Sequence, residues 1–407
     1  MKLKHVFCCG AALCMAPATA DAAVIKLIDL GGVTGSQAEL GFKIAAAYWG
    51  SILTNNVTIN LGVGFSALDE GVIGQTGSEQ ADYSVRNWER QVGLTRSNST
   101  LDLAAVLPTL NAQGGATFIT NGTDADGNDD TDALTVVTGN SRSSQVLFAN
   151  TSVLKAIGAR AANDTRIDGE VTFSSEFAFD FDPTNGIDRG AFDFLGVAIH
   201  EIGHALGFVS GVDFLDFFGF PDGPGAGVLG YGLNDTSIFS ALDMFRYSKD
   251  PNNLVFGTDG VLDLSVGTDS YFSIDGGKTA LFGNSFSTGA FNGDGSQASH
   301  WKDADGTTFE EVCTKQLGIM DPTFCFGQMG EVTALDLAAY DAMGWNISFD
   351  VLKNAGYTAT SATIYKELLG AVPEPTTWAM MLTGFAMVGG ALRGRRTKTK
   401  VRVSFAG

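Results

Sequence analysis

The sequence predicts an α+β protein, because two kinds of hydrophobic periodicity occur along one chain. Apolar residues recur at helical spacing over residues 37–53, and residues 57–65 then alternate with a period of two. Beyond residue 211 the chain becomes rich in Gly, Asp and Phe until a last helical stretch at 332–344. With 407 residues, 44% of them apolar, the chain can bury a sizeable core. We therefore expect regular helices and strands before residue 211 and few of them between there and residue 332.

The elements between these ends are predicted from local composition. Residues 97–110 favour another helix, and residues 146–158 a strand followed by a short helix. Residues 171–179 are rich in β-branched and aromatic side chains, which is typical of a strand. A helical stretch begins after Asp188, and Gly344 is expected to end the last helix.

The charge balance excludes one class of partner. The chain has 45 acidic and 25 basic residues, for a formal net charge of −20. Binding to a phosphate backbone requires clustered Lys and Arg, so a nucleic-acid partner is not expected.

The N-terminus carries the features of an export signal. Lys2 and Lys4 precede an apolar stretch of small residues, and Ala-Thr-Ala at 18–20 offers a cleavage site. The apolar stretch is too short to span a bilayer. We expect a secretory signal peptide over residues 1–23.

The C-terminus has the order motif, hydrophobic segment and basic tail. Val-Pro-Glu-Pro at 372–375 is followed by an apolar run at 376–392 and then by six Lys and Arg residues. This order resembles the PEP-CTERM sorting signal of Gram-negative bacteria, here over 372–402. The resemblance implies processing by an exosortase-type enzyme, transient membrane contact, and delivery to the cell envelope, the cell surface or the exterior. The alternative is an ordinary C-terminal membrane anchor, which the same basic tail would orient.

These end signals define the expected domain organisation. We expect one folded domain over residues 24–350, with an N-terminal subdomain to about 210, called upper, and a C-terminal subdomain at 211–350, called lower. Residues 351–371 are expected to be a linker.

The most informative motif is His200-Glu201-x-x-His204. On a helix, positions i and i+4 share one face, so both imidazoles can reach one Zn²⁺ at about 2.0–2.1 Å. Glu201 would then lie beside the open position of the metal and accept a proton from water. The motif is the signature of zinc proteases.

Catalytic zinc generally takes three protein ligands, so the motif requires one more. No Glu occurs between Glu201 and Glu310, and Ser210 stands where a contiguous motif would supply the third histidine. After removal of the signal peptide, the remaining histidine is His300. Asp213, just past the helix, is the alternative ligand, and the absence of a third ligand is also left open.

The order of short motifs along the chain resembles the leishmanolysin-type metzincin proteases and the bacterial PEP-CTERM metalloproteases. The motifs are His-Glu-x-x-His-Ala-Leu-Gly-Phe at 200–208, Ser-His-Trp at 299–301, Met-Asp-Pro at 320–322 and Met-Gly-Trp at 343–345. The resemblance implies a metzincin-like domain with a twisted mixed sheet, an active-site helix and an irregular C-terminal subdomain. It also implies a zinc metalloendopeptidase, a hydrolase acting on protein or peptide substrates.

Site roles follow from the same resemblance. His200, His204 and His300 would bind zinc, Glu201 would be the general base, and Met320 would form the Met-turn beneath the metal. Metzincins also place an edge strand beside the substrate. Residues 171–179 would be that edge strand or, equally, an ordinary core strand.

Cys313 and Cys325 are the cysteines left after removal of the signal peptide, and they bracket Met320. An even pair in an exported chain favours a disulfide.

Residues 124–132 concentrate acidic side chains and could hold Ca²⁺, although the pattern departs from an EF-hand loop. A solvated acidic turn is the preferred interpretation.

One alternative function belongs to another class. The protein could be a non-catalytic zinc-binding surface or extracellular-matrix protein, exported by the same route. A structural zinc site takes four protein ligands, and neither a fourth histidine nor a cysteine lies near His204. The open ligand position favours catalysis.

Overall fold

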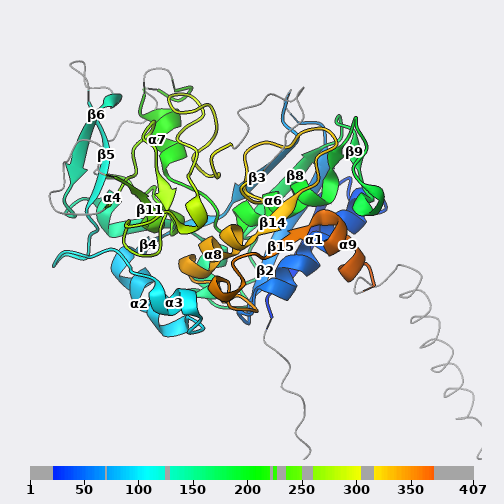
Figure 1. Cartoon of the computed structure of the whole chain (residues 1–407), viewed down its shortest axis with the longest axis horizontal. Helices are drawn as coiled ribbons and strands as arrows, with labels where there is room; N and C mark the ends of the chain where they lie inside the picture. The colour runs from blue at the N-terminus through cyan, green and yellow to red at the C-terminus, as the bar shows by residue number, and fades with distance from the viewer. Residues whose placement is uncertain are drawn as a thin grey trace, which may run out of the picture.

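The computed structural model describes residues 22–68, 71–123, 129–220, 223–226, 235–249, 260–303 and 316–370 (Figure 1). The fold is mixed α+β, with 30% helix, 24% strand and several small sheets. The predicted sorting signal, and the predicted signal peptide except its last two residues, lie outside the described residues. Within the described part of the chain, no helix combines the length and the apolar character needed to cross a membrane.

The largest sheet has four strands in the order β1-β2-β8-β3. β1 (Val24–Gly31), β2 (Thr58–Ser66) and β8 (Gly169–Ser174) run parallel, and β3 (Gly74–Ser78) is antiparallel to β8. The strand predicted at 171–179 is therefore an inner strand that ends at Ser174, and the edge strand next to it is β3.

Two helices pack against this sheet and against each other (Figure 1). α1 (Ala38–Ile52) confirms the first predicted helix, and α6 (Phe194–Ala205) carries the histidine motif. The Trp49 side chain of α1 donates a hydrogen bond of 3.0 Å to the carbonyl of Ile199 in α6. This contact fixes α6 against α1 one residue before His200.

The remaining upper elements surround this core. They are β4 (Gln80–Ser84), α2 (Val85–Thr95), α3 (Thr100–Ala104), β5 (Phe118–Thr123), β6 (Asp129–Val137), α4 (Arg142–Gln145), β7 (Val146–Asn150) and α5 (Thr151–Ala156). The strand and helix predicted at 146–158 are confirmed. The helix predicted at 97–110 is wrong in length, because the chain becomes extended at Ala105. Most of the acidic segment lies between β5 and β6, where residues 124–128 are outside the described part.

Three short elements lie between β8 and α6: β9 (Phe179–Asp180), η1 (Pro183–Asn185) and β10 (Phe192–Asp193). Beyond residue 211 the described chain consists of short elements joined by long irregular segments. They are α7 (Val212–Phe218), η3 (Leu242–Phe245), β11 (Arg246–Ser248), β12 (Val261–Leu262), β13 (Tyr271–Phe272), η4 (Leu281–Gly283), β14 (Glu331–Thr333) and α8 (Ala334–Met343). α8 ends before Gly344, whose φ of 121° suits glycine. This confirms the last predicted helix.

Residues 351–370 are folded, contrary to the expected linker. They form η5 (Leu352–Asn354), β15 (Thr358–Thr360), which pairs antiparallel with β14, and α9 (Ser361–Leu368). Ile364 and Tyr365 of α9 are buried in the main core. This burial of apolar surface is the physical reason for the difference, so the folded unit extends to about residue 370.

Candidate metal centre

Helix α6, which carries the histidine motif, is held at its N-terminus by a buried carboxylate. Asp193 accepts hydrogen bonds from the backbone N–H of Gly196 (3.0 Å) and of Gly330 (2.9 Å). The first bond caps the helix, and the second ties it to the segment before β14. Burial raises the pKa of Asp193.

Three histidine side chains meet at the end of this helix. The Nε2 atoms of His200 and His204 lie 3.1 Å apart, those of His204 and His300 3.1 Å, and those of His300 and His200 3.3 Å. Tetrahedral zinc with bonds of about 2.0–2.1 Å separates its ligand nitrogens by about 3.3 Å. The three nitrogens therefore match one face of such a site, and this cluster could hold a metal ion.

The other ring nitrogen of each histidine contacts a backbone carbonyl. His200 Nδ1 lies 2.7 Å from the oxygen of Ile319, His204 Nδ1 2.6 Å from that of Phe208, and His300 Nδ1 3.2 Å from that of Gln297. A carbonyl only accepts, so each Nδ1 carries the proton and each Nε2 presents its lone pair.

Burial keeps these imidazoles neutral. Desolvation lowers the pKa of His200 to about 3 and that of His204 to about 4, and it also lowers the pKa of His300. Three lone pairs that converge in a buried site repel one another unless a cation lies between them. The donor set therefore fits a divalent metal that accepts nitrogen ligands.

Glu201 lies beside the histidines with its carboxylate against β3. Thr76 Oγ1 is 2.7 Å from Glu201 Oε2 and 2.9 Å from the Glu201 carbonyl oxygen. Gly74 leaves the space that this carboxylate needs, because a Cβ there would lie 3.1 Å from Oε1. Burial raises the pKa of Glu201 to about 7. A carboxylate in this environment can accept a proton near neutral pH.

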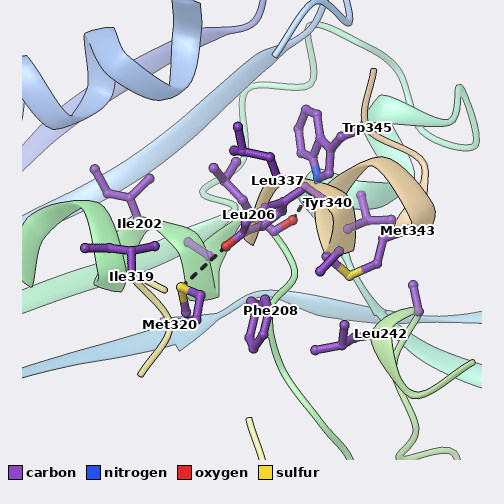
Figure 2. Packing of buried hydrophobic residues seen from close by; sticks show 14 of the residues in the cluster. Ile202, Leu206, Phe208, Leu242, Ile319, Met320, Leu337, Tyr340, Met343 and Trp345 are labelled. Atoms are coloured by element: carbon purple, nitrogen blue, oxygen red, sulfur yellow. Dashed lines mark hydrogen bonds between the residues drawn. The ribbon is translucent and has the colours of Figure 1, made fainter. Parts of the chain in front are cut away.

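Met320, the residue predicted to form a Met-turn, lies beneath α6. Its side chain is fully buried, and its sulfur accepts a hydrogen bond of 3.6 Å from the hydroxyl of Tyr340 in α8 (Figure 2). The carbonyl of the preceding residue, Ile319, accepts the Nδ1–H of His200. The turn therefore supports the first histidine directly.

Gly203, inside the motif, allows the helix to approach this turn. A Cβ at Gly203 would lie 2.5 Å from the Tyr340 hydroxyl and 2.7 Å from the Met320 sulfur. Gly203→Ala should destabilise the fold by about 1–3 kcal/mol, the usual cost of overpacking a core. Gly93→Ala in α2 is the control, because nothing lies within 4 Å of a Cβ there. Equal unfolding midpoints in denaturant for the two variants would contradict this account.

Asp336 of α8 joins the turn at Ile319 and Met320 to the segment that carries His300. Its buried carboxylate accepts from the backbone N–H of Ile319 (3.0 Å) and of Met320 (3.3 Å). It also accepts from the indole N–H of Trp301 (2.8 Å), the residue after His300. Asp336 is not among the site residues that the sequence predicted. The pattern Thr333-x-x-Asp336 at a helix start marked it as a capping residue, and only the fold brings the turn to it.

Asp213, the alternative ligand, lies outside the histidine cluster. Its carboxylate instead accepts from the backbone N–H of Ala298 (2.6 Å) and of Ser299 (3.0 Å), and from the Ser299 hydroxyl. Asp213 therefore positions the residues immediately before His300. Burial raises its pKa to about 6.

Asp216, one turn further along α7, repeats this arrangement. It accepts from the backbone N–H groups of Phe291 and Asn292, each at 2.8 Å. α7 thus holds the segment before His300 at two points. Ser210, in the place of a contiguous third histidine, instead donates to the buried Asp243 at 2.5 Å.

The predicted disulfide remains a prediction. Cys325 is buried, and Cys313 lies outside the described residues.

Comparison of the chain with protein-family models, with curated proteins and with solved structures found no match.

Proposed function

We propose that this protein is a zinc-dependent endopeptidase. The observation that carries the proposal is the triangle of three neutral histidines, each with Nε2 directed to one point and Nδ1 held by a carbonyl. Glu201 beside it provides a base, and the motif order resembles leishmanolysin-type metzincins.

The residues have separable roles in this proposal. Bound zinc supplies Lewis-acid catalysis and lowers the pKa of the attacking water. Glu201 accepts the proton of that water and returns it to the leaving amine. Thr76 fixes the Glu201 carboxylate through a hydrogen bond of 2.7 Å from its hydroxyl to Oε2.

We propose that a polypeptide substrate binds along β3. This strand is the edge of its sheet, and an extended peptide can add to such an edge through main-chain hydrogen bonds. A pocket of about 190 Å³ borders Glu201 and His200 at the start of β3. Its other walls include Ile73, Val197 and Phe324, which suit an apolar substrate side chain.

We also propose that the protein reaches the cell envelope or exterior of a Gram-negative bacterium. The terminal signals at 1–23 and 372–402 support this location. An exosortase-type enzyme is the proposed processing partner.

The proposed function is tested by metal removal. The purified protein should contain about one zinc per chain and should cleave an unfolded protein substrate. A chelator should abolish cleavage by removing zinc from its three histidine ligands. Added zinc should bind the same three nitrogens and restore cleavage. Zinc content is measured by elemental analysis and cleavage by mass spectrometry. Stoichiometric zinc without any cleavage would favour the non-catalytic zinc-binding alternative.

A further inference from the structure

A second pocket lies at the other end of β3 from the pocket beside Glu201. Gly74, at the start of β3, lines the first pocket, and Gln80, two residues after its end, lines the second. Between them, Ser78 Oγ donates a hydrogen bond of 3.1 Å to the carbonyl of His204. The first pocket therefore lies at the start of β3 and the second at the start of β4 (Gln80–Ser84), and Ser78 between them contacts the histidine helix.

The second pocket, which we call the distal pocket, has a volume of about 410 Å³. Its apolar walls are Phe148, Val209, Phe214 and Ile238. Phe148 is 37% exposed, so part of an aromatic face is open to a ligand. Arg142, paired with Asp82, lies at the polar part of the lining. The pocket thus offers an aromatic surface together with charged groups.

Hydrogen bonds join the distal pocket to the metal-binding helix. Gln80 Nε2 donates to the carbonyl of Phe148 (2.9 Å), and Asn150 Nδ2 donates to the carbonyl of His204 (3.1 Å). Val209 directly follows Phe208, whose carbonyl accepts the Nδ1–H of His204. These hydrogen bonds fix the wall of the distal pocket relative to His204.

We propose that the distal pocket binds an aromatic side chain of the polypeptide substrate, on the opposite side of the scissile bond from the pocket beside Glu201. The inference rests on the proposed function. Gly74 and Gln80 are six positions apart (80 − 74), so an extended segment of about 20 Å spans both pockets. The aromatic walls bury the ring of Phe or Tyr, and the polar part of the lining accommodates the Tyr hydroxyl. The substrate class is then an unfolded polypeptide held on both sides of the cut.

Cleavage-site profiling with a peptide library tests this proposal. Phe148→Ser should lower kcat/KM about tenfold for peptides that place Phe or Tyr in the distal pocket, because part of the contact between aromatic rings is lost. Phe282→Ser is the matched control, since Phe282 is 44% exposed and lines a different pocket. Ser237→Trp, which fills the distal pocket, should act like Phe148→Ser. Zinc content verifies that each variant retains the metal site.

Direct binding separates this proposal from the proposed function. A Phe-containing hexapeptide should bind the zinc-loaded wild type about tenfold more tightly than Phe148→Ser or Ser237→Trp. Weaker binding by these variants without cleavage by any protein would uphold the pocket and overturn the endopeptidase. Unchanged binding and an unchanged cleavage profile in both variants would overturn the pocket, whatever the activity.

Discussion

His300→Ala should lose tight zinc binding. The variant leaves two imidazoles, His200 and His204, where catalytic zinc generally takes three protein ligands. Removing a residue that only hydrogen-bonds to a metal ligand typically weakens metal binding ~10–100-fold. The loss of zinc affinity in His300→Ala should be larger than that. Competition with a chromogenic chelator measures the affinity, and circular dichroism verifies the fold.

Asp213→Asn should weaken zinc binding by about 10–100-fold, less than His300→Ala, because it disturbs only the positioning of His300. Its carboxylate holds the backbone N–H groups of Ala298 and Ser299. Asp216→Asn is the matched control, since Asp216 makes the same kind of contact with residues 291–292, further from His300. Wild-type affinity in His300→Ala would contradict the ligand set, and equal losses in the two Asp variants would contradict the positioning role.

Glu201→Gln should retain zinc and lose activity by about 10²–10⁴-fold, the usual contribution of a general base. The amide keeps the shape of the side chain, so the three histidines are undisturbed. The residue cannot accept a proton, however, and the attacking water is no longer activated. Turnover of a fluorogenic peptide at saturating zinc measures the effect.

Thr76→Val is the companion variant, because it removes the hydroxyl that lies 2.7 Å from Glu201 Oε2 while leaving the carboxylate in place. It should reduce turnover by less than Glu201→Gln does. Near-normal turnover in Glu201→Gln together with full zinc content would contradict the assignment of the base.

Local patterns predicted three of the regular elements closely. The helical spacing at 37–53, the alternation at 57–65 and the Gly344 stop predicted α1, β2 and α8, because each pattern reflects contacts within a few residues. His200, Glu201 and His204 were predicted for the same reason, since one turn of helix brings them together. His300 lies 96 positions from His204 (300 − 204). It was predicted from the resemblance and because it is the one histidine outside the motif once the signal peptide is removed.

The tertiary structure alone decided the contacts between distant segments. It placed β3 at the sheet edge, joined residues 351–370 to the core, and turned Asp213 from a candidate ligand into a support for the His300 segment. It also brought Asp336 to Met320 and Trp301. The physical reason is that a buried carboxylate needs hydrogen-bond donors, and the fold supplies them from segments far away in the sequence. The positions of such donors follow no periodic pattern from which they could be predicted.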